Sequence, residues 1–254
     1  MTLKPCIVLT IAIVGVTWSI SPSPRTAKAQ EPTSKTVTAK RNSAVVPVPR
    51  PRRENWMKRH KEFNERAKKG DVDLLFIGDS ITEGWDDDGK EVWAKYYGSR
   101  KASNIGFSGD RTQHILWRLD HGNVDGIQPK LVVLMIGTNN WQDNTMEEIA
   151  EGVETVVHRL NEKLPKSKVL LMAILPRDDH VKETREKFKH VNERIAKLAD
   201  GKTVTFLDLT AKFLNPDGKL NTEALPDLVH LGPKGFEIWA EAIEPEVAAA
   251  VGKQ

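Results

Sequence analysis

"LLFIGDSITEGW", residues 74–85, decides the fold of this 254-residue chain. Five mostly apolar residues lead into a glycine, an aspartate and a serine, Ser80. An unbroken apolar run is typical of a strand that is covered on both faces, as in a parallel sheet. A serine just beyond such a strand can cap the next helix or act as a nucleophile. The rest of the chain must decide between these two roles.

Similar apolar runs recur along the chain and alternate with helical patterns. We expect strands over 73–78, 102–106, 130–137, 168–176 and 203–209, and helices over 55–69, 112–122, 146–164, 180–201 and 233–251. This alternation predicts an α/β fold, a doubly wound parallel sheet of about five strands in a single domain. Ligands of such sheets bind beyond the carboxyl ends of the strands. The segments "GDS", "GFSGD" and "GTNN" all follow strands at that edge.

The first 29 residues have the layout of a secretory signal peptide. Lys4 precedes an apolar run over 7–20, and "AKA" at 27–29 fits a cleavage site. The run is shorter than the roughly 20 residues that span a membrane. We expect cleavage, export to the periplasm or the extracellular space, and no transmembrane segment in the mature form. A retained membrane anchor is the alternative.

Charge is distributed unevenly along the chain. Its formal net charge is +3, and residues 1–29 hold three of the cations and no acid. Residues 30–53 carry six cations against one acid, so residues 54–254 are net −5. Because a nucleic-acid-binding domain needs a basic face on the fold itself, we expect no nucleic-acid partner. Residues 30–53 are also rich in proline, which predicts a disordered basic linker that does not shape the crevice. The domain is expected over 54–254.

Cysteine and cofactor chemistry are not expected. Cys6 is the only cysteine and lies in the signal-like segment. The mature chain would therefore have no disulfide, no thiol nucleophile and no cysteine metal site. We expect neither a metal nor an organic cofactor.

A nucleophilic serine needs a base and an orienting acid. Six of the seven histidines lie in ordinary helices or polar stretches, whereas His230 lies in "LPDLVHLGP" before the last helix. Asp227 precedes it by three residues, so that one loop can supply the imidazole and the carboxylate that orients it. The surroundings of Ser80 are not G-x-S-x-G, which excludes the nucleophile turn of the α/β-hydrolases.

Acyl transfer also needs donors for an oxyanion. "NIGFSGD" offers the backbone N–H of Gly109, and "GTNN" offers the side-chain amide of Asn139. Turn glycines and turn asparagines are common for purely structural reasons, so each of these signals is weak by itself.

Together, "GDSIT", "GFSGD", "GTNN" and "DLVH" resemble, in order and spacing, the SGNH hydrolases, the GDSL-type esterases and acylhydrolases. The resemblance covers residues 72–245. "GDRTQHILWRLDHG" followed by "PKLVVLMIGTNN" is most similar to the catalytic α subunits of intracellular platelet-activating-factor acetylhydrolases and their bacterial relatives. The common "GxND" form reads "GTNN" here, with Asn140 in place of an aspartate. The signal-like segment and basic linker depart from that intracellular group.

The resemblance implies a role for each matching residue. Ser80 would be the nucleophile, and His230 and Asp227 would complete a catalytic triad. Gly109, Asn139 and the Ser80 N–H would form the oxyanion hole. It leaves the oligomeric state open, a homodimer included.

The substrate is less specified. Trp85, Trp117 and Trp141 lie near the motifs and could stack on a sugar ring or cap a short acyl chain. For Trp117, which lies in a predicted helix, packing in the core is the alternative. No long apolar lid is evident, so we expect hydrolysis of short acetyl esters, with acetylated carbohydrate as the leading small substrate. The alternatives are a lysophospholipase or thioesterase with a longer acyl chain, and a non-catalytic carbohydrate-binding module.

Overall fold

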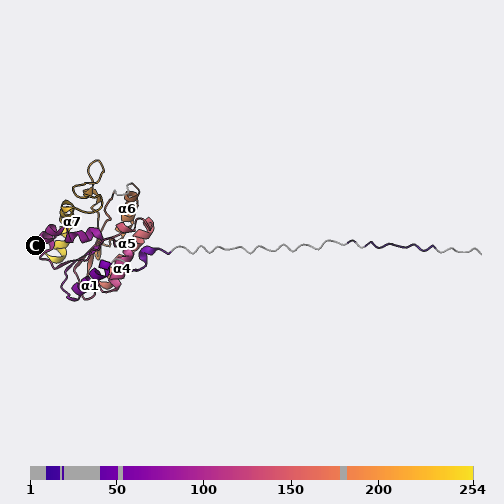
Figure 1. The fold of residues 1–254 in the computed structure, drawn as a ribbon, viewed down its shortest axis with the longest axis horizontal. Helices are drawn as coiled ribbons and strands as arrows, with labels where there is room; N and C mark the ends of the chain where they lie inside the picture. Colours follow the sequence, from indigo (N-terminus) through magenta and orange to yellow (C-terminus); the bar gives the residue numbers. More distant parts are fainter. Residues whose placement is uncertain (1–9, 18, 20–40, 51–53, 178–181, 254) are drawn as a thin grey trace, which may run out of the picture. The chain divides into compact units, whose positions relative to one another are not determined.

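The structure is a computed structural model that describes residues 10–17, 19, 41–50, 54–177 and 182–253 (Figure 1). The chain divides into two units, Met1–Lys40 and Arg41–Gln254. The predicted cleavage site at 27–29 and linker residues 30–40 and 51–53 lie outside the described residues. Within the described parts, no helix has the length and apolar character needed to cross a membrane. The fold below is that of the second unit.

A five-stranded parallel sheet forms the centre of the described domain. Its order is β2-β1-β3-β4-β5, so the chain runs outward from β1 in both directions, and the predicted fold class is confirmed. The strands are β1 (Leu74–Gly78), β2 (Ala102–Asn104), β3 (Leu131–Met135), β4 (Lys168–Met172) and β5 (Val204–Leu207).

Helices cover both faces of this sheet, which explains why the central strands are apolar throughout. Alternate strand residues point to opposite faces. Leu75 and Ile77 join the core under α1 (Glu54–Lys68), α4 (Thr112–Asp120), α5 (Met146–Lys163) and α6 (Lys182–Ile195). Leu74 and Phe76 join the core under α3 (Lys90–Tyr97) and α7 (Pro233–Val251). Figure 1 shows α7 apart from the group of α1, α4 and α5.

Two helices were missed by the sequence prediction. α2 (Ser80–Glu83) follows β1 directly, and α3 lies between β1 and β2. α2 is a single turn, too short to show a helical period, and α3 is only eight residues long. Short 3₁₀ turns complete the chain: η1 (Ser43–Val45), η2 (Gly84–Asp86), η3 (Thr138–Asn140), η4 (Ala196–Leu198) and η5 (Thr210–Phe213).

The expected disordered linker is wrong over residues 41–50. This segment, the N-terminal arm, packs on the domain, and Ala44 is fully buried. Asn42 Nδ2 donates to the carbonyl of Glu148 at 3.0 Å, and Thr112 Oγ1 donates to the carbonyl of Ala44 at 2.7 Å. The composition of the segment suggested disorder, but these hydrogen bonds between side chains and backbone carbonyls, together with one buried alanine, hold it against α4 and α5.

Candidate active site

Ser80 is positioned by the tight connection between β1 and α2. β1 ends at Gly78, where a Cβ would lie only 2.4 Å from the carbonyl oxygen of Met135, so only glycine fits. The cap of α2 is Asp79, whose Oδ1 accepts from the N–H of Ile81 at 3.0 Å. Because Asp79 fills the capping position, the Ser80 hydroxyl is left for another partner.

That partner is His230, on the loop before α7. Ser80 Oγ lies 2.9 Å from His230 Nε2, and His230 Nδ1 lies 2.6 Å from Asp227 Oδ2. Asp227 Oδ1 also accepts from the N–H groups of His230, at 2.6 Å, and Val229, at 3.0 Å. These backbone bonds fold the loop so that its aspartate and histidine face one another. The structure thus brings Ser80 to His230, which lies 150 positions later in the sequence, and to its neighbour Asp227.

The hydrogen-bond directions of this series follow from its chemistry. Burial pushes the pKa of Asp227 upward, but the hydrogen bonds from the His230 ring and the loop N–H groups outweigh it and hold the pKa below its usual value. The ionised carboxylate can only accept, so Nδ1 of His230 donates. Nε2 is then free to accept the Ser80 proton. The pair is open to solvent, with side chains 48% exposed for His230 and 57% for Asp227.

Gly109 lies in a tight turn, Phe107–Asp110, that follows β2. The N–H of Asp110 donates to the carbonyl of Phe107 at 3.0 Å. Gly109 has φ 73°, in the left-handed region that favours glycine. A Cβ at this position would lie 2.9 Å from an Nη2 atom of Arg50. The predicted oxyanion donor is therefore a backbone group in a conformation that other residues would adopt only with strain.

The two asparagines of "GTNN", Asn139 and Asn140, make hydrogen bonds to different parts of the domain. Asn139 Nδ2 donates to the carbonyl of Asp110 at 2.9 Å, which links the η3 turn to the Gly109 turn. Asn140 is buried, and its Oδ1 accepts from the N–H of Thr112 at 3.1 Å. Asn140 therefore holds the start of α4, and Asn139 carries the amide that faces the neighbouring loop.

The predicted site segments meet at one edge of the sheet. Gly78 pairs in register with Met135, so the chains leading to Ser80 and Asn139 leave neighbouring strands. On the other side, the N–H of Phe107 donates to the carbonyl of Gly78 at 3.1 Å. The carboxyl edge of β1 thus collects the serine, the glycine turn and the asparagine amide, as the topology predicts.

Asp79 is a site residue that the sequence reasoning overlooked. It is buried next to Ser80, and burial raises its pKa to about 7 despite the hydrogen bond from Ile81. An aspartate at a strand–helix junction is itself a cap signal. The sequence analysis considered Ser80 as the cap of the next helix, but the structure has Asp79 in that position.

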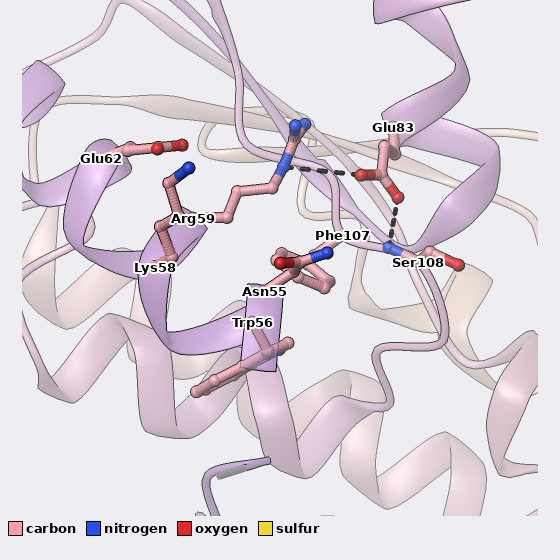
Figure 2. A pocket seen from close by; sticks show the side chains of 8 residues that line it. All are labelled: Asn55, Trp56, Lys58, Arg59, Glu62, Glu83, Phe107 and Ser108. Carbon is pink, nitrogen blue, oxygen red and sulfur yellow. Dashed lines mark hydrogen bonds and ion pairs between the residues drawn. The ribbon is translucent and has the colours of Figure 1, made fainter. Parts of the chain in front are cut away.

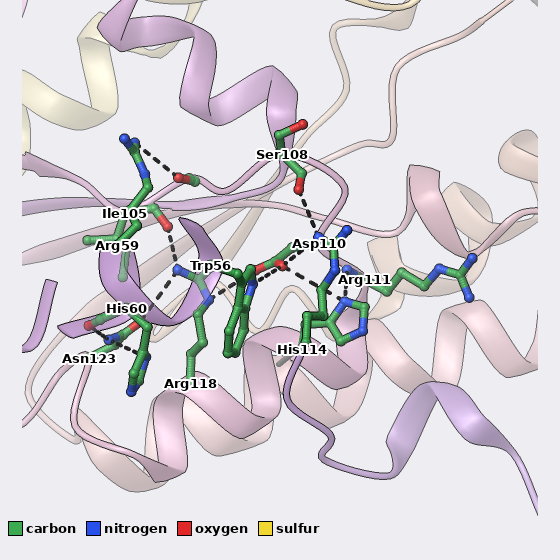
Figure 3. Close-up of polar contacts among 12 residues, drawn as sticks. Trp56, Arg59, His60, Ile105, Ser108, Asp110, Arg111, His114, Arg118 and Asn123 are labelled. Carbon is green, nitrogen blue, oxygen red and sulfur yellow. Dashed lines mark hydrogen bonds and ion pairs between the residues drawn. The ribbon is translucent and has the colours of Figure 1, made fainter. Parts of the chain in front are cut away.

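Asp110 is a second overlooked residue, and it is completely buried. Trp56 Nε1 donates to Asp110 Oδ1 at 2.8 Å, and Arg118 Nε pairs with Oδ2 at 3.0 Å (Figure 3). Arg118 Nη1 also donates to the carbonyl of Ile105 at 2.8 Å. The signal in the sequence was an arginine inside the apolar pattern of 112–122, because a buried arginine needs a partner.

The three tryptophans near the motifs have different environments. Trp85 is buried in the core, with its ring centre 4.5 Å from that of Phe236 and the two rings tilted, so it does not reach a substrate. Trp117 packs against α1. Trp141 is half-buried, with the Arg177 guanidinium 5.7 Å from its ring centre. Of the three, Trp141 follows the η3 turn directly and lies nearest in sequence to Asn139.

A polar cavity of about 640 Å³ borders the Gly109 turn (Figure 2). Glu83 Oε2 accepts from the N–H of Ser108 at 2.6 Å, and Arg59 Nε lies 3.5 Å from Glu83 Oε1. Polar and charged side chains line most of it, together with two aromatic rings. The lining residues are Asn55, Trp56, Lys58, Arg59, Glu62, Glu83, Phe107 and Ser108.

An apolar groove of about 510 Å³ lies at the ends of β4 and β5. Its apolar lining residues are Ile174, Pro176, Phe188, Ala196, Phe206 and Leu214. The strand order places β4 two strands from β1, about 10 Å at ordinary strand spacing.

The sequence matches one protein family and is similar to several known acetylhydrolase subunits. The GDSL-like Lipase/Acylhydrolase family matches residues 76–238. Platelet-activating factor acetylhydrolase IB subunit alpha1 of Homo sapiens is 36% identical over 182 residues, 71% of this chain and 78% of that protein. The alpha2 subunit of Rattus norvegicus is 34% identical over 187 residues, 72% of this chain and 79% of that protein.

Solved structures share the fold. A GDSL-like lipase from Bacteroides thetaiotaomicron superposes with a TM-score of 0.61 at 23% identity, covering 75% of this chain and 98% of that one. An acetylxylan esterase from Geobacillus stearothermophilus gives a TM-score of 0.51 at 21% identity, covering 68% and 93%. Family match, relatives and fold agree, and the chain belongs to the GDSL-like lipase/acylhydrolase family of the SGNH hydrolase superfamily, a family of carboxylic ester hydrolases.

Proposed function

We propose that this protein is a serine esterase that hydrolyses short-chain esters, above all acetyl esters, through an acyl-enzyme on Ser80. One observation carries the proposal: a hydrogen-bond series runs from Ser80 Oγ through His230 to Asp227 at 2.9 and 2.6 Å. This is the arrangement that lets a base take the serine proton while an acid holds the base in the required tautomer. Family membership makes ester hydrolysis the chemistry that this series would perform.

The mechanism has two halves. His230 Nε2 takes the proton as Ser80 Oγ attacks the ester carbonyl carbon, and the carbonyl oxygen becomes an oxyanion. The N–H groups of Ser80 and Gly109 and the Asn139 amide would stabilise that charge. The bond to the alcohol then breaks, and the alcohol leaves with the proton from His230. Water repeats the sequence on the acyl-enzyme, releasing the acid and restoring Ser80.

An acetyl ester of a polar alcohol is the proposed substrate class. Relatives at 34–36% identity are named acetylhydrolases, which favours a small acyl group. The cavity beside Ser108 is lined mainly by charged and polar side chains, including Lys58 and Glu62. Such a lining suits a hydroxyl-rich alcohol, such as an acetylated carbohydrate, better than a lipid tail.

Export is part of the proposal. It rests on the three-part layout of residues 1–29, which precede the packed arm. Mass spectrometry of the protein made in a secreting host is expected to find a mature N-terminus near residue 30. Full-length protein retained in the cytoplasm would contradict export.

A second candidate function is hydrolysis of longer acyl esters, as by a lysophospholipase or thioesterase. The observation that favours it is the apolar groove lined by Phe206 and Leu214 at the same edge of the sheet. An acyl chain of about eight carbons could extend from the β1 edge to this groove.

A chain-length series separates the two functions. Aryl esters from acetyl to octanoyl, together with acetylated sugars, are compared on the wild type, on Ser80→Ala and on the exposed control Ser99→Ala. We expect the highest kcat/KM for acetyl esters. Ser80→Ala should lose its activity, whereas Ser99→Ala should keep the activity of the wild type. A preference for octanoyl esters that Leu214→Asp abolishes would favour the second candidate. Full activity in Ser80→Ala would reject both.

A further inference from the structure

The N-terminal arm ends beside the proposed oxyanion hole. Arg50 Nη1 donates to the carbonyl of Ser108 at 2.8 Å and lies 3.3 Å from Asp110 Oδ1. It thus contacts both residues that flank Gly109.

The Ser108 carbonyl matters because it belongs to the same peptide unit as the Gly109 N–H. In a trans peptide these two groups point in opposite directions, so fixing the carbonyl fixes the direction of the N–H. Glycine at φ 73° restrains that peptide weakly, because glycine has access to several backbone conformations. A charge-assisted hydrogen bond on the carbonyl supplies the missing restraint and also polarises the N–H.

Asp110 connects this peptide to the second proposed donor. Its buried carboxylate is held by Trp56 and Arg118, while its carbonyl accepts from Asn139 Nδ2 at 2.9 Å. Arg50 adds a third cationic or polar contact to the carboxylate. The orientation of the Gly109 turn and of the Asn139 amide therefore depends on one residue, Asp110, that Arg50 contacts.

The arm holds Arg50 in place from outside the sheet. Val48 N–H donates to the carbonyl of Gln113 at 3.2 Å, and Asn144 Nδ2 donates to Ser43 Oγ at 2.9 Å. These contacts anchor the arm on α4 and on the chain before α5, so the side chain at position 50 enters from a fixed direction.

We propose that Arg50 is a positioning residue of the oxyanion hole, which holds the Ser108–Gly109 peptide so that the Gly109 N–H faces the reacting carbonyl. This proposal rests on the proposed function, in which Gly109 is an oxyanion donor. It makes residues 41–50 part of the proposed active site. The sequence analysis had expected that this segment does not shape the crevice.

The test compares Arg50→Ala, Arg50→Lys and the control Arg41→Ala, an exposed arginine of the same arm, on an acetyl aryl ester. Loss of a whole oxyanion donor costs about 10²–10³ in turnover. Loss of its positioning in Arg50→Ala should lower kcat about 10- to 100-fold with KM within about two-fold. Arg50→Lys should recover part of the loss, since an ammonium group can also donate to the Ser108 carbonyl. Arg41→Ala should match the wild type.

Fluorophosphonate labelling of Ser80 distinguishes positioning from misfolding. In Arg50→Ala the labelling rate should fall while the final extent stays complete, because every molecule keeps its nucleophile. A lower final extent that accounts for the lost turnover, a raised KM with normal kcat, or wild-type kinetics would each overturn the proposal. If Ser80→Ala stays active, the proposed function fails. If Ser80→Ala is inactive and Arg50→Ala is normal, only this inference fails.

Discussion

The two halves of the candidate site are built in opposite ways. The base loop is exposed, and a local pair three residues apart, Asp227 and His230, makes its key contact. The proposed oxyanion half is organised by Asp110, which is completely buried and is contacted from α1, α4 and the N-terminal arm. An exposed pair contributes little to folding, and removing a buried partner is costly. Substitutions on the two sides should therefore separate activity from stability.

The largest effect is expected on the exposed side, in turnover alone. Asp227→Asn leaves an amide that favours the wrong His230 tautomer, so kcat should fall by up to about 10⁴-fold. The unfolding midpoint in urea should stay near that of the wild type. Asp217→Asn is a matched control, because Asp217 is also exposed and accepts a backbone N–H two residues on, at 3.0 Å. Unchanged kcat in Asp227→Asn would remove Asp227 from the proposed triad.

On the buried side, the largest effect is expected in stability. Arg118→Met removes the fully buried cation that faces Asp110 and should lower the free energy of unfolding by about 3–5 kcal/mol. Adding Asp110→Asn should restore part of this loss, because it removes the uncompensated charge. Urea unfolding followed by tryptophan fluorescence measures both variants. A loss below about 1 kcal/mol in Arg118→Met would show that the buried pair does not stabilise the domain.

Two adjacent asparagines give the same contrast within one turn. Asn139→Ala removes a proposed oxyanion donor, so kcat should fall about 10²–10³-fold with little change in KM. Asn140→Ala leaves buried groups at the start of α4 without their partner and should cost about 1–3 kcal/mol of stability. Steady-state kinetics, corrected for the fraction of folded protein, should show the loss of turnover in Asn139→Ala. Urea unfolding should show the loss of stability in Asn140→Ala. Weakened binding with normal turnover in Asn139→Ala would instead make it a ground-state contact.

The smallest effect per measured step concerns pH and Asp79. Burial raises the pKa of Asp79 to about 7 from an ordinary value near 4. Between these pH values the folded state keeps a proton that the unfolded state releases, so stability contributed by this group falls as pH rises and levels off above about pH 7. The slope is at most about 1.4 kcal/mol per pH unit. Asp79→Asn, which keeps the cap, should lose that slope in urea unfolding at pH 5, 6, 7 and 8. Parallel curves for the two proteins would contradict the raised pKa.

The same contrast explains what could be predicted from the sequence. The strands were visible because continuous apolar runs are local patterns, and Asp227 and His230 were visible because three positions separate them. The organisation of the proposed oxyanion half was not, since Arg50 and Trp56, 60 and 54 positions before Asp110, join Arg118 at its carboxylate. The pairing of distant charges depends on how helices dock, which no short window contains.

The N-terminal arm was missed for a different reason. Its proline and basic residues have the composition of a solvated linker, and composition reports average behaviour. The packing of the arm depended on a few single contacts: one buried alanine, Ala44, and two hydrogen bonds between side chains and backbone carbonyls that link the arm to α4 and α5. Trp85 shows the converse error, because a position near the motif suggested a surface role and its ring packs in the core.

The central claim is that Ser80 is the nucleophile and that His230 activates it. The most direct measurement is mass spectrometry of the fluorophosphonate-treated wild type, Ser80→Ala and His230→Ala, with digestion to locate the adduct. The account predicts one adduct per wild-type chain, on Ser80, none on Ser80→Ala, and labelling of His230→Ala slowed by at least about 100-fold. An adduct on another residue, or labelling of Ser80→Ala at the wild-type rate, would contradict it.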